Sequence, residues 1–145
     1  MSTERLYPLL KHAQLQLTEL IGPALAPYGI DGRELAVLNA IADKASLSQQ
    51  EVARGLGIDR TTMVAMVDAL ERKGLVRRNP HPADRRKNTV ELTAAGRDVR
   101  PRATRASLDA ERRFLEPLGE ADAKRLKEAL STLIAAATAR RPAGD

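Results

Sequence analysis

The chain has 145 residues, of which 43% are hydrophobic and only 2% aromatic, so one domain could form a core of aliphatic side chains. It has no cysteine, which excludes disulfides, thiol redox sensing and cysteine-based zinc sites. The net charge of +5 is a weak indication of a polyanionic partner. No apolar run approaches the ~20 residues that span a bilayer, and the N-terminus lacks the apolar segment of a signal peptide. We therefore expect a cytoplasmic protein without a membrane partner.

The first element that the sequence predicts is an amphipathic helix over residues 4–21. Its apolar residues recur at spacings of 4 and 3, the period of one helix face. They are Leu6, Leu10, Ala13, Leu17 and Leu20. Gly22 and Pro23 follow, and we expect them to end or kink the helix.

Three further helix starts are marked by capping residues. Asp31 and Ser48 are each followed three residues later by a glutamate, Glu34 or Glu51, which is the capping-box pattern. Asp59 is a third N-cap candidate. The sequence therefore predicts three short helices in succession.

A β-hairpin is predicted after these helices. Gly74 is placed to end the third of them as a left-handed C′ residue. The segments "LVRR" (75–78) and "NTVEL" (88–92) then resemble two short strands. The loop between them is long for a hairpin tip.

Two longer helices are predicted in the C-terminal part. Thr93 is the N-cap of the first, which includes Pro101 in its first turns, and Pro117 and Gly119 end it. Its apolar positions are Val99, Ala103, Ala106, Ala110 and Phe114. Those of the second are Leu126, Leu130, Leu133 and Ala137. The last residues, 139–145, are expected to be a flexible tail.

Positive charge is concentrated near the hairpin. Residues 46–100 hold 11 basic and 7 acidic residues, net +4, whereas residues 1–45 have net −1 and residues 101–145 net +2. Within 72–87, seven cations stand beside one acid, Asp84. The cations are Arg72, Lys73, Arg77, Arg78, Arg85, Arg86 and Lys87. This pattern indicates a partner at the loop, although most charge runs are solvated surface.

Residues 49–68 have the spacing of a helix-turn-helix. This motif needs a small residue where the two helices touch, a glycine in the turn and apolar residues on the inner face of the second helix. Ala53, Gly57, Met63 and Met66 stand at those offsets. A plain helical hairpin that binds nothing is the alternative, and the following basic hairpin makes it less favoured. A helix-turn-helix followed by such a hairpin is a winged helix, whose second helix fits the major groove of DNA.

The expected fold is mainly α-helical with a small β-hairpin wing, a winged helix-turn-helix plus N- and C-terminal dimerisation helices. A dimer is expected because one winged helix makes few base contacts, and because the outer helices have apolar faces too long for so small a domain to bury. The alternative is that these helices only extend a monomer. The expected parts are 1–30 (N-terminal dimerisation helix and connector), 31–93 (DNA-binding domain), 94–138 (C-terminal dimerisation helices) and 139–145 (tail).

Residues 47–97 resemble the MarR family of winged-helix transcriptional regulators. The resemblance rests on "LSQQEVARGLGIDRTTMVAMVDALERKGLVRRNPHPADRRKNTVELTAAGR", above all on "LERKGLV", "DRR" and "VELTAAG". The flanking helices also fit, so it covers nearly the whole chain. It implies an obligate homodimer on a palindromic site in double-stranded DNA, with the first, fifth and sixth helices interlocked. It implies neither a cofactor nor a metal.

The resemblance also implies particular DNA contacts. The wing pattern of an Asp, any residue and an Arg falls on Asp84 and Arg86, with Arg86 in the minor groove and Asp84 orienting it. Arg85 and Lys87 would follow the DNA backbone. The exposed positions of the recognition helix are Arg60, Thr61, Thr62, Val64 and Ala65. Ser48 and Gln49 are expected phosphate contacts.

The recognition helix departs from the family pattern at Val64 and Ala65, where members commonly carry a polar residue and an arginine. Arg60 could then read bases, or Val64 could contact thymine methyl groups. This leaves the recognised sequence open, but not DNA binding.

The resemblance further implies a small effector, often a phenolic or aromatic anion, that releases a repressor from DNA. Tyr7 and His12 are the candidate ligand residues, although such residues are more often interface or surface groups. The absence of cysteine argues against the peroxide-sensing branch of the family. An enzyme is not expected, because His12 and His81 have no catalytic partners in the sequence. A winged-helix protein-interaction module without ligand response remains the alternative.

Overall fold

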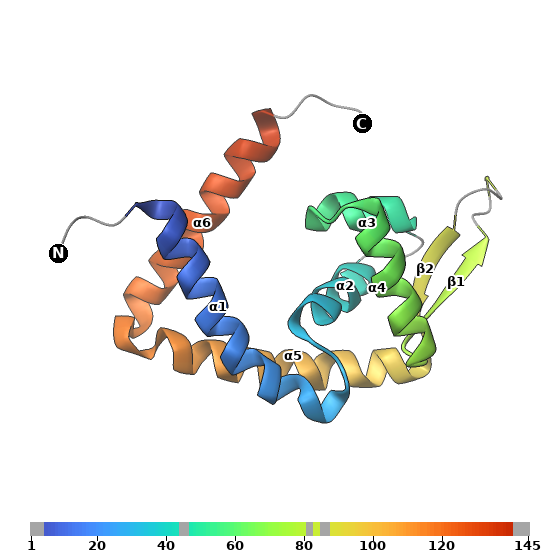
Figure 1. Cartoon of the computed structure of the whole chain (residues 1–145), viewed down its shortest axis with the longest axis horizontal. Coiled ribbons are helices and arrows are strands. Elements are labelled where there is room, and N and C mark those ends of the chain that lie inside the picture. Colours follow the sequence, from blue (N-terminus) through green and yellow to red (C-terminus); the bar gives the residue numbers. More distant parts are fainter. Residues whose placement is uncertain (1–4, 44–46, 81–82, 85–87, 141–145) are drawn as a thin grey trace.

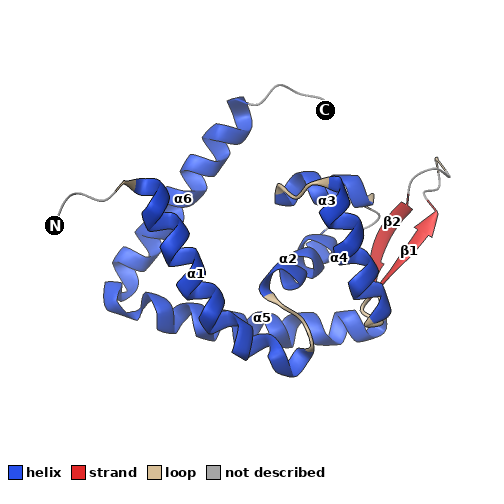
Figure 2. Ribbon diagram, viewed as in Figure 1, coloured by secondary structure: helices blue, strands red, loops and turns tan. Residues whose placement is uncertain are grey.

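The computed structural model describes residues 5–43, 47–80, 83–84 and 88–140. This part is mainly helical, with one two-stranded antiparallel sheet, which confirms the expected fold class (Figures 1 and 2). The α-helices are α1 (Leu6–Leu25), α2 (Gly32–Asp43), α3 (Gln49–Leu56), α4 (Arg60–Arg72), α5 (Ala94–Leu115) and α6 (Gly119–Arg140). The strands are β1 (Val76–Pro80) and β2 (Asn88–Leu92), and short 3-10 helices lie at Ala26–Tyr28 and Glu116–Leu118.

Helix α1 does not end at Gly22 and Pro23, so the expectation that they end it is wrong, whereas a kink there stays a prediction. The helix continues to Leu25 and passes into a 3-10 turn, which ends at Gly29 with φ 71°. Pro23 stands in the last turn of the helix, where the loss of one backbone hydrogen bond disturbs little that follows. The left-handed backbone at Gly29, which favours glycine, is where the chain turns towards α2.

The predicted caps of the next three helices are confirmed. Asp31 and Glu34 bond reciprocally, with Asp31 Oδ1 accepting from Glu34 N at 2.8 Å and Glu34 Oε1 accepting from Asp31 N at 3.0 Å. Ser48 and Glu51 form the same capping box. Asp59 accepts from the backbone N–H at position 62 at 3.0 Å and begins α4.

The end of α4 and the second strand follow the prediction, whereas the first strand is Val76–Pro80 instead of residues 75–78. Gly74 has φ 74°, and the next residue, Leu75, donates its N–H to the Leu70 carbonyl at 3.0 Å. The strands pair from Val76↔Leu92 to Pro80↔Asn88. The hairpin therefore starts directly after α4 in the chain.

One core joins helices α2, α3 and α4 to the hairpin. Its most deeply buried side chains include Val37, Leu38, Met63, Val67, Leu70, Val76 and Val90. The first turn of α5 touches this unit closely, because a Cβ on Gly96 would lie 2.1 Å from the Leu75 carbonyl oxygen. Thr93 caps α5 as predicted and also donates its hydroxyl to the Gly74 carbonyl. The long helix is thus anchored to the winged unit at its start.

The long helices extend away from the winged unit. α1 packs along α5, and α6 rises from the far end of α5 (Figure 1). The predicted break lies at the 3-10 turn Glu116–Leu118 and at Gly119, whose φ is 74°. α6 continues through Ala139 and Arg140, which were expected in the tail, while residues 141–145 lie outside the described part. No described helix is both long and apolar enough to cross a membrane.

Candidate nucleic-acid interface

The helix-turn-helix consists of α3, a tight turn and α4. Ala53 (6% exposed) and Met63 (1% exposed) are buried where the two helices meet, and Gly57 has φ 66° in the turn. The Ile58 N–H closes the turn on the Ala53 carbonyl at 2.9 Å. The residue types expected from the spacing therefore occupy the positions that the motif requires.

The N-terminal half of α4 presents four of the five expected recognition residues. Arg60, Thr61, Val64 and Ala65 are exposed. Thr62 is half-buried instead, and its hydroxyl donates to Asp59 Oδ1 at 2.6 Å. The hydrogen bonds from Thr62 lower the pKa of the Asp59 carboxyl below its ordinary value of 3.8. Thr62 therefore holds the helix start, beside the exposed face.

A hollow of about 270 Å³ lies between α3 and α4. It is lined by Gln49, Gln50, Ala53, Arg54, Ile58, Arg60 and Met63. Arg54, which the sequence reasoning did not single out, adds a second cation beside Arg60. The signal that could have found it is the helical pattern of α3, whose buried positions Val52 and Ala53 leave Arg54 on the opposite, exposed side.

The two residues expected to contact phosphate are both engaged within the protein. Ser48 is 5% exposed, and its hydroxyl accepts the Glu51 N–H in the capping box. Gln49 is half-buried and accepts a hydrogen bond from Arg78 Nε at 3.0 Å. Their phosphate contacts remain a prediction.

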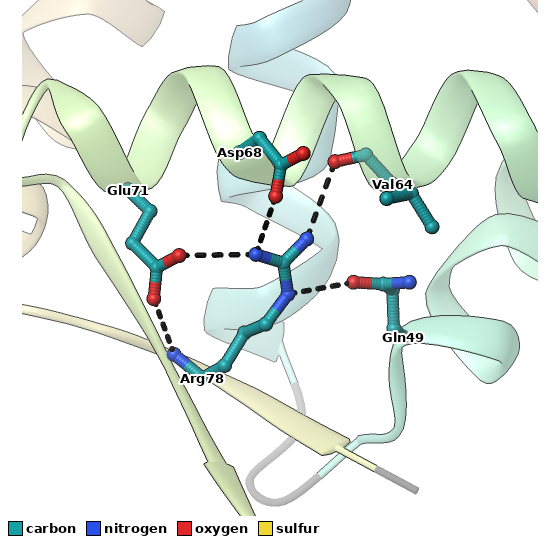
Figure 3. A network of polar contacts seen from close by, with 5 residues as sticks. All are labelled: Gln49, Val64, Asp68, Glu71 and Arg78. Atoms are coloured by element: carbon teal, nitrogen blue, oxygen red, sulfur yellow. Dashed lines mark hydrogen bonds and ion pairs between the residues drawn. The ribbon is translucent and has the colours of Figure 1, made fainter.

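Arg78 is the centre of a polar network between the hairpin and the helix-turn-helix (Figure 3). Its guanidinium Nη1 lies 2.6 Å from Asp68 Oδ1 and 3.0 Å from Glu71 Oε1, and its Nη2 donates to the Val64 carbonyl at 3.2 Å. With the bond to Gln49, one side chain from β1 reaches both α3 and α4. In the sequence, Arg78 is distinguished only as one of the cations near the loop.

Two more of those cations have partners from other segments. Lys73 Nζ lies 2.7 Å from Glu34 Oε2, which joins the end of α4 to the start of α2. Arg77 pairs with Glu91 across the hairpin, and this lowers the pKa of the Glu91 carboxyl. Three of the seven cations of the cluster, Lys73, Arg77 and Arg78, therefore pair with acids of other elements or of the facing strand.

The wing tip lies mostly outside the described residues. Asp84 is described and half-buried, whereas Arg85, Arg86 and Lys87 are not. The expected orientation of Arg86 by Asp84 therefore remains a prediction.

The candidate ligand residues stand on the open surface of α1. Tyr7 is 76% exposed, and His12 is exposed as well. Within one protomer neither side chain is enclosed, so a ligand role for them is also still a prediction. Among the described residues, no three His, Asp or Glu side chains are grouped as metal ligands.

A polar junction that the sequence did not reveal lies between α2 and α5. Arg100 Nη1 and the Thr104 hydroxyl both donate to Asn39 Oδ1, at 3.2 and 3.3 Å. The Nε of Arg100 is buried there and has no partner within the described part of the chain. A buried guanidinium N–H without an acceptor carries a desolvation cost.

Known proteins resemble this chain in both sequence and structure. Residues 28–87 match the sequence profile of the MarR family. The structure of the transcriptional repressor CouR bound to a 23-mer DNA duplex is 35% identical, with a TM-score of 0.84 over 90% of this chain and 92% of that chain. CouR from Rhodococcus jostii RHA1 bound to p-coumaroyl-CoA is 26% identical, with a TM-score of 0.79 over 90% of this chain and 91% of that one.

A curated relative is the putative transcriptional regulatory protein for the hcr operon of Thauera aromatica. It is 32% identical over 105 residues, which are 72% of this chain and 58% of the relative, so the chain spans less than two thirds of its length. The match to CouR at 35% identity, which covers 92% of that chain, shows the family. The chain therefore belongs to the MarR family of winged helix-turn-helix transcriptional regulators, which are not enzymes.

Proposed function

We propose that this chain is a dimeric, sequence-specific DNA-binding regulator that represses transcription and is released by a small ligand. The observation that carries the proposal is the exposed N-terminal face of α4, where Arg60, Thr61, Val64 and Ala65 face outwards over a buried helix-turn-helix core. A helix presented in this way fits the major groove of B-form DNA.

The chemistry of this face suits base recognition. An arginine can donate two hydrogen bonds to a guanine edge, a pairing that contributes about 1–3 kcal/mol of discrimination. Arg60 is the residue for this role, and Val64, which is 36% exposed, offers methyl groups to a thymine methyl. So few base contacts give limited selectivity, which is why two copies on a palindromic site are part of the proposal.

The long helices support a second copy of this chain as the partner. α6 has no buried residue, and several large apolar side chains on α1 and α6 are exposed. They include Leu6, Leu9, Leu10, Leu126, Leu133 and Ile134. Burial of apolar surface contributes a favourable free energy of about 25 cal/mol per Å² removed from water. Two protomers that cover these faces would place two α4 helices on half-sites ~34–36 Å apart.

The wing supplies the proposed sequence-independent part of binding. Arg86 enters the minor groove, where a narrow groove concentrates negative potential. Arg85 and Lys87 lie along the backbone. This placement rests on the family wing pattern and on the hairpin, whose strand β1 packs against α4 and whose Thr89 forms a β-bridge with Ser48 at the start of α3.

For the effector we propose an aromatic or phenolic anion. CouR has been seen bound to p-coumaroyl-CoA, and the Arg100 junction offers this chain a cationic group where α5 meets the winged unit. Tyr7 and His12 would contribute only if the partner protomer covers α1. The ligand must bind the DNA-free shape more tightly than the DNA-bound shape, because otherwise it shifts no equilibrium.

Replacing Arg86 with Ala tests the wing. Loss of a minor-groove arginine should weaken operator binding about tenfold or more, which corresponds to about 1.4 kcal/mol. The measurement is a shift assay on a duplex selected from a random pool. Arg125→Ala on α6 removes the same charge far from the wing, and it should leave the affinity unchanged (Figure 1). Equal affinities of Arg86→Ala and the wild type would overturn the wing placement.

Salt dependence separates the DNA-binding function from its alternative, a protein-interaction module without ligand response. Phosphate contacts release counterions, so duplex affinity should fall steeply and linearly with salt on logarithmic axes. A wild-type chain that binds no member of the duplex pool at low salt would favour the interaction module.

A further inference from the structure

Arg77 and Arg78 are neighbours on β1 but have different surroundings. Successive residues of a strand point to opposite faces. The side chain of Arg77 is 58% exposed and pairs with Glu91 within the hairpin. That of Arg78 is 18% exposed and points at the helix-turn-helix.

The partners of Arg78 on α4 form one stripe. Val64, Asp68 and Glu71 are spaced by 4 and 3, so they lie on one face of the helix. The guanidinium bonds to the carbonyl of the first and to the carboxylates of the other two, while the Arg78 backbone N–H donates to Glu71 Oε2 at 3.3 Å. Through both its side chain and its backbone, Arg78 thus attaches β1 to more than one turn of α4.

The same guanidinium reaches two residues with proposed DNA roles. Gln49 at the start of α3 accepts from Nε, and the carbonyl of Val64, whose side chain is on the recognition face, accepts from Nη2. A planar fork that donates in several directions at once can do this, whereas an ammonium group cannot copy its geometry. Because two carboxylates already face it, Arg78 is poorly placed to neutralise a phosphate.

We propose that Arg78 is a positioning residue that sets the placement of the wing relative to the recognition helix, and so contributes to sequence specificity without touching DNA. The inference rests on the proposed placement of α4 and the wing on DNA. Sites that recognise a partner by geometry depend on support within about 0.5 Å. A loosened hairpin would still meet phosphates, but α4 and the wing could no longer fit one operator together.

The test uses two double variants that each remove one positive and one negative charge. Asp68→Asn/Arg78→Gln breaks the contact between wing and helix, and Arg77→Gln/Glu91→Gln breaks the pair within the hairpin as the matched control. Affinity is measured for the selected operator and for an unrelated duplex, over a series of salt concentrations, with the circular dichroism melting curve of each protein.

For the first double variant we expect about tenfold weaker operator binding, with unchanged affinity for the unrelated duplex and an unchanged salt slope. The control should bind both duplexes as the wild type does. Equal losses in the two variants, or none in either, would overturn the proposal. A salt slope smaller by about one would do so as well, because it would mean a lost phosphate contact.

A second variant keeps the proposal testable if the first does not fold. Arg78→Lys retains the charge but not the fork, so the ratio of operator to unrelated affinity should fall by a few-fold. A wild-type ratio in this variant would overturn the role of the guanidinium. If the wild-type protein itself binds no duplex, the proposed function fails instead, and the result is distinct from either outcome for Arg78.

Discussion

The winged unit and the outer helices of this protein bury their apolar side chains in different ways. The winged unit packs side chains such as Leu38 and Leu70, both 0% exposed, into one continuous core. On α6, Leu133 and Ile134 are 55% and 65% exposed, although their helical spacing is as regular as that of the core residues. An apolar helix face predicted from the sequence therefore does not indicate whether the same chain or a second chain covers it.

The two regions also differ in their charges. The acids of the winged unit, such as Glu34, Asp68 and Glu91, reach cations that are distant in the sequence. The pairs on α5 and α6 include several between neighbouring turns, such as Arg112 with Asp109 and Arg125 with Asp122. Pairs of the first kind tie elements together, whereas exposed pairs of the second kind contribute little.

The largest effect is expected from the core of the winged unit. Leu38→Ala should lower the free energy of unfolding by about 2–5 kcal/mol, because it leaves a cavity in a fully packed site. Val64→Ala, at an exposed site of the same unit, should change it by less than about 0.5 kcal/mol. Chemical denaturation followed by circular dichroism measures both. A small effect of Leu38→Ala would mean that the core holds the unit less tightly than its burial indicates.

The next effect tests the outer helices. Leu133→Glu/Ile134→Glu should reduce the mass in solution from twice the 15.8 kDa chain mass to that of one chain. Each apolar side chain contributes roughly 1.5–3 kcal/mol when buried, so the dimer should weaken by about 100-fold or more. Light scattering at micromolar concentration is the measurement.

The control for the dimer is Val64→Glu, which adds a charge to an exposed apolar site of the winged unit. This variant should keep the dimer mass and lose operator binding. A double glutamate variant that remains dimeric would remove the α6 face from the interface and end the contrast between the two regions.

The smallest effect is a dependence of winged-unit stability on pH. Hydrogen bonds from Thr62 and the pairing with Arg77 lower the pKa values of Asp59 and Glu91 below 3.8 and 4.5. Both groups then bind fewer protons in the folded chain, so stability is complete above about pH 4.5 and falls as the solution is acidified through the lowered pKa values. Asp59→Asn/Glu91→Gln should flatten this decline in melting temperature below pH 4.5. Identical slopes would show that other carboxylates cause it.

Local features of the fold could be predicted from the sequence because their partners are close in the chain. The caps at Asp31, Ser48 and Asp59 join residues three positions apart. Gly74 ends α4 because left-handed backbone favours glycine. Because Asp59 sets the start of α4, the exposure of Arg60, Thr61, Val64 and Ala65 could also be predicted, whereas Thr62 is half-buried.

Features that depend on packing could not be predicted in this way. α1 passes through Gly22 and Pro23 and continues to the buried Leu25, although both residues weaken a helix. Thr62 carries the same kind of side chain as Thr61, yet only Thr62 turns back to the cap. Whether a threonine side chain bonds to the cap or stays exposed depends on its place in the folded backbone, which the residue type does not specify.

The sequence by itself determined the helix-turn-helix, the hairpin and the family, since each is encoded in residues a few positions apart. Only the tertiary structure decided that Lys73, Arg77 and Arg78 of the 72–87 cluster pair with acids. Arg78 meets Gln49, Asp68 and Glu71 across separations of 29, 10 and 7 residues. Gly96 meets Leu75 in the same way, at a distance that excludes a side chain. Contacts of this kind form only when the core has brought β1 and the start of α5 against the helix-turn-helix. For this reason no local sequence pattern predicts them.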